Sequence, residues 1–245
     1  MIYFCGMAQH YFQFKQFKIE QDKCAMKVCT DACLFGALAA NFGTVTKNIT
    51  VLDIGTGTGL LSLMYAQKND SAKIDAVEID EDAFEQAKEN VACSGWENIT
   101  VHHQSVQEFS KARNACYDFV LSNPPFFEND LKSENEQRNT ALHSSDLTLK
   151  ELMETANKLL SENGTFCVLL PFSRMEYFIG QAEKTHLFLR KKILVRQTPE
   201  HDFFRSILFF TREFSDCETE EITIKKGDTY SLKFSELLRD YYLYL

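Results

Sequence analysis

The sequence lacks any unbroken apolar run of about eighteen residues, the length that a membrane-spanning helix requires. We therefore expect no membrane segment. The N-terminal stretch MIYFCGMAQHYFQFKQF also lacks the basic lead and apolar core of an export signal, because Gln, His and Lys interrupt its aromatic residues. These two absences predict a cytoplasmic protein.

No two of the eight cysteines form a C-x-x-C pair. Without an export signal the compartment is reducing, so we expect free thiols rather than disulfides. Cys24, Cys29 and Cys33 lie close together, but their spacing matches no common zinc signature. We interpret them as small buried residues and expect no metal site.

The chain is short of basic residues relative to acidic ones, and its net charge is −9. Taken as a sum, this excess of acid opposes nucleic-acid binding. The charge is unevenly distributed, because residues 1–48 hold five lysines against three acids, and residues 171–212 hold eight basic residues against four acids. These two blocks flank an acidic middle segment and could together form a patch for a polyanion.

Apolar runs and helical patterns alternate from residue 49 to residue 185, which is typical of parallel strands joined by helical crossovers. We predict seven strands, at 49–54, 73–80, 98–103, 117–122, 165–171, 187–196 and 205–213, with weaker signals at 221–226 and 229–233. We predict helices at 30–41, 60–68, 82–95, 147–164, 173–184 and 234–243, the third ending at Gly95. The expected fold is a doubly wound, mostly parallel α/β sheet with helices on both faces, formed by residues 49–245 after an N-terminal extension over 1–48.

A glycine-rich turn follows the first strand and reads Asp53-Ile54-Gly55-Thr56-Gly57-Thr58-Gly59. Glycine permits positive φ and a close approach of a ligand to the backbone, and the next helix offers free N–H groups. The dinucleotide fingerprint G-x-G-x-x-G would need glycine at position 60, where the chain has leucine, so a nicotinamide oxidoreductase is disfavoured.

The acid that precedes these glycines suits a cationic ligand better than a phosphate. S-adenosylmethionine carries a sulfonium and an ammonium group, so Asp53 indicates that cofactor. Glu78 ends the second strand, nineteen residues beyond Gly59. An acid at that place can accept hydrogen bonds from both ribose hydroxyls of a bound nucleoside.

The fourth strand ends in Asn123-Pro124-Pro125-Phe126. The two prolines fix the backbone and remove two N–H donors, which leaves carbonyl oxygens free for a ligand. The side-chain oxygen of Asn123 and the carbonyl of Pro124 could hold both hydrogens of one planar amine and orient its nitrogen toward a methyl group. Phe126 and Phe127 offer faces on which a planar ring could stack.

Together, D-x-G-x-G-x-G on the first strand and N-P-P-F on the fourth resemble the class I, Rossmann-like methyltransferases that act on amino nitrogens. The prefix narrows this resemblance to bacterial tRNA1(Val) (adenine(37)-N6)-methyltransferases, through Phe14-Lys15-Gln16-Phe17-Lys18-Ile19, Met26-Lys27-Val28 and Thr30-Asp31. The resemblance implies S-adenosylmethionine as cofactor and tRNA as partner, with methylation of N6 of the adenosine beside the anticodon. It also implies that Thr30 and Asp31 close over the cofactor, and that the loop ending in His143 belongs to the site.

The chain departs from that family at three places. Cys29 stands where the family usually has glycine, and Leu142 precedes His143 where we expect arginine. After the third strand, Gln104-Ser105-Val106 replaces the aspartate that often binds the adenine of the cofactor. We assign that weaker contact to Ser105.

Six basic residues without an intervening acid predict an RNA surface: Lys184, His186, Arg190, Lys191, Lys192 and Arg196. We take Lys191 and Lys192 as its substrate contacts, and an edge strand protected by charge is the alternative. The polar segment 127–146 has no clear periodicity and follows the fourth strand, which is typical of a functional lid.

Other functions stay open on these residues. Enzymes with an N-P-P-[FY] motif also methylate guanine N2 in ribosomal RNA, adenine in DNA or a glutamine amide in protein, because each target is a planar NH2 group. The aromatic prefix favours tRNA. The alternative outside the enzymes is a module that binds the cofactor and interacts with RNA but does not catalyse methyl transfer. We expect a monomer.

Overall fold

The computed structural model describes residues 10–42, 48–113, 117–125 and 147–245. Its main sheet has eight strands in the order β10-β8-β9-β7-β6-β3-β4-β5. These strands are β3 (Thr50–Ile54), β4 (Lys73–Glu78), β5 (Ile99–His103), β6 (Tyr117–Ser122), β7 (Leu160–Pro171), β8 (Phe188–Arg196), β9 (Phe203–Thr211) and β10 (Glu218–Thr223). A small hairpin of β11 (Lys225–Lys226) and β12 (Thr229–Tyr230) follows them.

Strand direction defines one functional edge of this sheet. β9 runs antiparallel to β7 and to β8, and all other neighbouring pairs are parallel. The other seven strands therefore end at a common edge, here called the carboxyl edge. Open α/β sheets bind ligands at that edge. The predicted doubly wound, mostly parallel α/β fold is confirmed.

The predicted count of seven strands is wrong, because the main sheet has eight. The additional strand is β10, which lies at the end of the sheet and pairs in parallel with β8. Its sequence ETEEIT has one large apolar residue, Ile222, which is fully buried. A strand that inserts a single side chain into the core gives only a weak local pattern.

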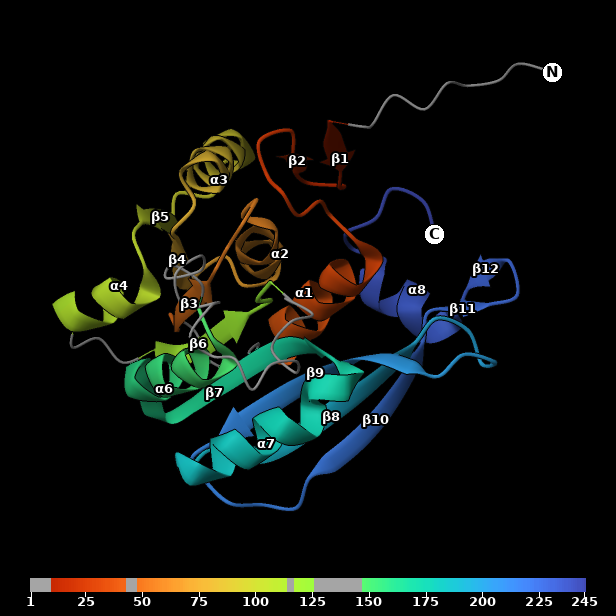
Figure 1. The fold of residues 1–245 in the computed structure, drawn as a ribbon. Coiled ribbons are helices and arrows are strands. Elements are labelled where there is room, and N and C mark those ends of the chain that lie inside the picture. The colour runs from red at the N-terminus through yellow and green to blue at the C-terminus, as the bar shows by residue number, and fades with distance from the viewer. Residues whose placement is uncertain (1–9, 43–47, 114–116, 126–146) are drawn as a thin grey trace, which may run out of the picture.

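Helices cover both faces of the sheet (Figure 1). One face packs against α1 (Thr30–Phe42), α2 (Leu60–Lys68), α3 (Glu81–Ser94) and α8 (Leu232–Leu238). The other packs against α4 (Val106–Ala112), α6 (Leu149–Leu159) and α7 (Met175–Lys184), which the short helix η2 (Phe172–Arg174) precedes. In the part of the chain that the structure describes, none of these helices has the length and apolarity needed to cross a membrane.

The helix predicted over 147–164 ends five residues early, because β7 begins at Leu160 and pairs there with Tyr117 of β6. A Cβ on Gly164 would lie 2.8 Å from the carbonyl oxygen of Tyr117. This glycine thus permits a close approach of two strands rather than ending a helix. The prediction at Gly95 is confirmed, since that residue caps α3 with a φ of 83°.

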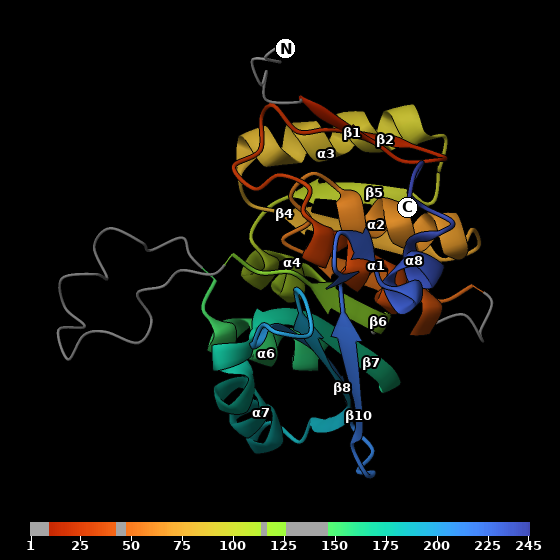
Figure 2. The same ribbon diagram turned by 90° about the vertical axis from the view of Figure 1, so that its right-hand side faces the viewer.

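The described residues before β3 form a hairpin of β1 (Tyr11–Gln13) and β2 (Lys18–Glu20), followed by α1. The rings of Phe14 and Phe17 stack with their centroids 4.5 Å apart, and Phe14 forms a β-bridge with Tyr242 near the C-terminus. The aromatic residues of the prefix motif are therefore buried. They hold the hairpin beside α3, where Figure 2 shows it.

Candidate active site

The glycine turn and the Asn-Pro-Pro segment leave the carboxyl edge side by side. β3 and β6 are neighbours, and Ile54 lies opposite Ser122 in their register. Gly55 and Asn123 are the next residues of the two strands. The order of the strands thus places together two motifs that lie 68 residues apart in the sequence.

The backbone of the turn requires its glycines. Gly55, Gly57 and Gly59 have φ angles of 69°, 56° and 82°, which other residues adopt only with strain. A Cβ on Gly55 or Gly57 would meet no atom within 4 Å, and both residues line the same cavity. The space beside them is therefore open to a ligand.

The carboxylate of Asp53 is fully buried directly beneath this turn. The hydroxyls of Thr56 and Ser62 donate to its Oδ2 atom at 2.6 Å and 2.7 Å. Its Oδ1 atom has no hydrogen-bond partner among the described residues. Burial raises the pKa of Asp53 to about 6, although the two hydroxyls partly offset that effect. A cationic group reaching Oδ1 would satisfy this oxygen and lower the pKa of Asp53 again.

Glu78 lies at the end of β4 and lines the cavity. Its Oε2 atom accepts a hydrogen bond from the Gly57 N–H at 2.8 Å, and Oε1 accepts from the N–H groups of Ile79 and Asp80 at 2.9 Å and 3.0 Å. These three bonds fix the carboxylate against the turn. Because a carboxylate has about four acceptor positions, it can still accept a hydroxyl from a ligand.

A cavity of about 320 Å³ runs along the carboxyl edge, within the size range of small-molecule sites. It is lined by the glycine turn, Glu78, Ser105 and residues 122–125, and it is closed on one side by residues 24–26 of the extension. A smaller pocket of about 60 Å³ adjoins it and is lined by residues 26–29 and 55–58. Asn123 lines both spaces.

Asn123 offers a second unused acceptor. Its Oδ1 atom is buried and has no hydrogen-bond partner within the described ranges. Pro124, which is buried beside it, contributes no N–H that could compete for a ligand hydrogen. Phe126, Phe127 and His143, which the sequence also placed in the site, lie outside the described residues.

These features fit S-adenosylmethionine. Asp53 Oδ1 and Asn123 Oδ1 are two of the seven buried side-chain atoms that have no partner among the described residues. Asn123 lines both cavities, whereas Asp53 lies beneath the glycine turn and lines neither of them. Buried polar atoms without partners are rare, because each costs roughly 1–3 kcal/mol. An ammonium group and a substrate amine are donors of the kind that these two oxygens need. Across the described residues, no three His, Cys, Asp or Glu side chains form a group that could hold a metal ion.

Ser105 has a structural role that the sequence did not indicate. It caps α4, a helix that we did not predict, by accepting a hydrogen bond from the Glu108 N–H at 3.2 Å. It also lines the cavity, together with Gln104 and Gln107. Since its hydroxyl oxygen is already an acceptor, the hydroxyl hydrogen is what Ser105 can offer to a cofactor.

Thr30 and Asp31 do not line either space. They form the first turn of α1, and the Asp31 carboxylate accepts a hydrogen bond from Arg205 of β9 at 2.7 Å. Sequence reasoning missed Arg205, because the two partners lie 174 residues apart. The extension instead reaches the cavities through residues 24–29 and Ala32.

The two lysines proposed for RNA contact differ in their surroundings. Lys191 forms ion pairs with Glu218 at 3.0 Å and Glu220 at 2.7 Å, both on β10. Lys192 makes no ion pair with any residue that the structure describes. β8 is not an edge strand, because β10 covers it. The alternative of an edge strand protected by charge is therefore wrong for this segment.

Comparison with known proteins places these features in a family. The profile described as "Methyltransferase small domain" matches residues 32–182. A tRNA1(Val) (adenine(37)-N6)-methyltransferase from Flavobacterium johnsoniae is 40% identical over 235 residues, covering 95% of this chain and 99% of the relative. A protein of the same name from Dyadobacter fermentans is 42% identical over 239 residues, covering 95% of this chain and 97% of the relative. Among solved structures, a predicted O-methyltransferase from Agrobacterium tumefaciens has a TM-score of 0.64 and 14% identity, and the match covers 84% of this chain and 95% of that one.

Proposed function

Because the chain belongs to the tRNA1(Val) (adenine(37)-N6)-methyltransferase family, we propose that it transfers a methyl group from S-adenosylmethionine to N6 of adenosine 37 in that tRNA. The observation that carries this proposal is the buried Oδ1 atom of Asn123, which has no partner among the described residues and belongs, with Pro124, to the lining of the cavity. An acceptor pair at this place suits an amine with two hydrogens, which the N6 group of adenine has.

The cofactor, when bound, supplies a methyl group on a sulfonium that leaves without further activation. Asp53, beneath the glycine turn, would balance its positive charge, and Glu78 would accept a ribose hydroxyl. Asn123 Oδ1 and the Pro124 carbonyl each accept one hydrogen of the substrate amine, which turns the nitrogen lone pair toward the cavity. A bond forms between N6 and the methyl carbon, the bond from sulfur to that carbon breaks, and the surplus proton on N6 passes to water.

Substrate binding would involve further residues. We assign stacking on the adenine ring to Phe126 and Phe127, and an RNA contact to His143. Lys192 is the better candidate of the two lysines for a phosphate, because Lys191 already has two carboxylate partners.

The test is methyl transfer from labelled S-adenosylmethionine to tRNA from cells that lack this enzyme, followed by nucleoside analysis. We expect label in N6-methyladenosine, and none when the tRNA carries guanosine at position 37. Label in N2-methylguanosine of ribosomal RNA, in DNA or in protein would move the substrate to another N-P-P-F class. Cofactor binding with no transfer to any of these would indicate the non-catalytic module.

A further inference from the structure

Three buried amide side chains hold the segment of the extension that walls the cavity. Gln21, Gln86 and Asn90 are 6%, 1% and 2% exposed. Gln21 lies in the extension, and its Oε1 atom accepts a hydrogen bond from the Val28 N–H at 2.8 Å. The other two lie one turn apart on α3. A buried amide is costly unless its hydrogen bonds are made, so these side chains fix the backbone that they contact.

Asn90 uses every polar atom of its side chain on backbone groups. Its Oδ1 atom accepts from the Glu20 N–H at 2.9 Å, and its Nδ2 atom donates to the Glu20 carbonyl at 2.9 Å. The same Nδ2 atom donates to the carbonyl of Thr58 at 2.9 Å. Thr58 lies between two glycines of the turn. Asn90 therefore joins the extension and the glycine turn through one side chain.

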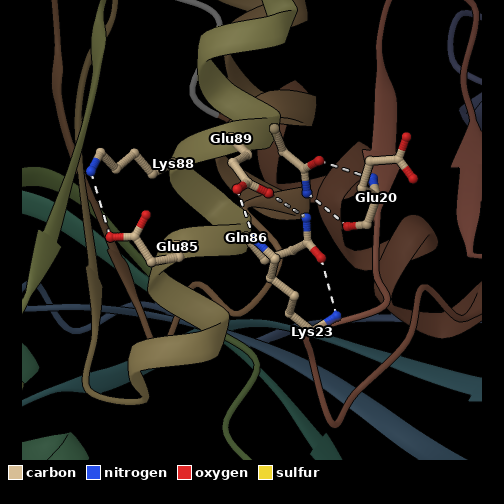
Figure 3. Close-up of polar contacts among 7 residues, drawn as sticks. Glu20, Lys23, Glu85, Gln86, Lys88 and Glu89 are labelled. Carbon is tan, nitrogen blue, oxygen red and sulfur yellow. Dashed lines mark hydrogen bonds and ion pairs between the residues drawn. The ribbon is translucent and has the colours of Figure 1, made fainter.

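Gln86 bonds to the extension and to Glu89 of its own helix, and neither bond reaches the glycine turn. Its Oε1 atom accepts from the Lys23 N–H at 3.2 Å, and Figure 3 shows this side chain on α3 with contacts to Lys23 and Glu89. The next residue after Lys23 is Cys24, which lines the cavity, as do Ala25 and Met26. The amides of α3 thus fix the chain just before it becomes the cavity wall.

The charged residues at this junction are solvated. Lys23 and Glu89 form an ion pair at 2.7 Å with side chains 39% and 53% exposed, and Glu85 and Lys88 lie at 3.5 Å with still greater exposure of Lys88, at 60%. Exposed pairs of this kind contribute little. The connection between extension and turn therefore depends on the buried amides rather than on the charges.

We infer that Asn90 and Gln86 are positioning residues for the cofactor, and that Asn90 couples the extension to the glycine turn. This inference rests on the proposed function, because it requires the cavity to bind S-adenosylmethionine or its product. A ligand that touches both the turn and residues 24–29 favours the arrangement in which Asn90 bonds to both. By linkage, the ligand then stabilises the extension as much as the extension stabilises ligand binding.

The experiment measures binding of S-adenosylhomocysteine to the full chain by calorimetry, together with backbone hydrogen exchange. In the wild type, we expect the ligand to slow exchange over residues 20–28. We expect Asn90→Leu to raise the dissociation constant roughly ten-fold and to abolish this protection, as a coupling of ordinary size would. Gln86→Leu should raise the dissociation constant roughly three-fold, because the bond from Asn90 to the turn survives. Glu85→Gln, on the exposed side of the same helix, is the matched control and should leave both readouts unchanged.

Steady-state kinetics separate positioning from general damage. Asn90→Leu should raise KM for S-adenosylmethionine while kcat at saturating cofactor and KM for tRNA stay near the wild-type values. A folded Asn90→Leu protein that binds S-adenosylhomocysteine as tightly as the wild type, with the same protection of residues 20–28, would overturn the inference. If Asn90→Leu does not fold, the inference is tested by the affinity of Gln86→Leu for S-adenosylhomocysteine and by the protection of residues 20–28 in the wild type. An unchanged affinity in Gln86→Leu, or no protection in the wild type, would overturn it. A wild type that binds no S-adenosylhomocysteine would instead overturn the proposed function, and the inference with it.

Discussion

The Ser122 hydroxyl donates a hydrogen bond of 2.8 Å to the Ile54 carbonyl, and both residues are buried. They are the last residues of β6 and β3, and they lie opposite each other in the parallel register. The glycine turn and the Asn-Pro-Pro segment begin at the next residue of each strand. This bond adds to the parallel pairing of β3 and β6 at the point where the cofactor motif and the group proposed to orient the substrate amine leave the sheet.

Replacing Ser122 with alanine should impair both stability and turnover. The Ile54 carbonyl would be left without its partner in a buried place, so the free energy of unfolding should fall by about 1–3 kcal/mol. We expect kcat to fall while the affinity for S-adenosylhomocysteine changes little, because the glycine turn itself is intact. Chemical denaturation and steady-state kinetics check this. Ser110→Ala is the matched control, since the buried Ser110 hydroxyl donates to Gln107 within its own helix. Equal kcat for both variants would contradict the role given to Ser122.

Asn123→Ala should remove amine orientation and leave cofactor binding. The lost acceptor is Oδ1, so we expect kcat to fall on the order of 10²-fold, the effect of a misplaced reactant. The dissociation constant of S-adenosylhomocysteine should stay within about two-fold of the wild-type value. Asn123→Asp keeps an acceptor oxygen at the same place and should retain much more activity than the alanine variant. Wild-type turnover by Asn123→Ala would exclude the proposed role.

The sequence was sufficient for the features that depend on local pattern. The glycine turn, the strand before it and the Gly95 cap each depend on a few adjacent residues whose backbone preferences are strong. The position of Asn123 beside the turn followed from strand alternation, because parallel strands share a carboxyl edge.

The features that sequence reasoning missed depend on distant partners. Gly164 was interpreted as a helix cap, although its lack of a side chain serves the approach to Tyr117 of another strand. Lys191 is predicted from the sequence to contact RNA, and that pattern gives no sign of its ion pair with Glu220, which forms once β10 pairs with β8. The bond between Asp31 and Arg205 likewise forms only after β9 takes its place. Contacts between residues so far apart leave no local sequence pattern from which they could be predicted.

Gly57→Ala should weaken cofactor binding more than it weakens the fold. Its φ of 56° costs a non-glycine residue roughly 1–2 kcal/mol, and the new methyl group would occupy space that lines the cavity. Gly180→Ala is the control, because that glycine lies in α7, where an added Cβ also meets nothing within 4 Å. Alanine there should be neutral or stabilise by up to about 1 kcal/mol. Calorimetry with S-adenosylhomocysteine and thermal unfolding separate the two effects, and equal ligand affinity for both variants would contradict this reading of the turn.

Asp53 should make stability depend on pH with a definite sign. Burial raises its pKa from 3.8 to about 6 in the folded chain, so the fold favours the neutral carboxyl. That contribution is fully present below pH 3.8 and is lost as the pH rises through about 6, a change of about 3 kcal/mol for this buried group. Asp53→Asn removes the titration. In the absence of cofactor, the wild type should therefore lose unfolding free energy relative to Asp53→Asn as the pH rises through this window. A constant difference between the two proteins would show that the Asp53 pKa is not raised.

Charge reversal at Lys191 should lower stability, whereas charge reversal at the adjacent Lys192 should lower tRNA affinity. Lys191→Glu would bring a third carboxylate to Glu218 and Glu220, so we expect the free energy of unfolding to fall by roughly 1 kcal/mol or more, with tRNA affinity unchanged. Lys192→Glu disturbs no ion pair among the described residues, and if its ammonium binds a phosphate, tRNA affinity should fall and the salt slope should drop by about one. Binding titrations at several salt concentrations, with denaturation of each variant, distinguish these outcomes. If both variants bind tRNA with the wild-type affinity and slope, neither lysine contacts a phosphate.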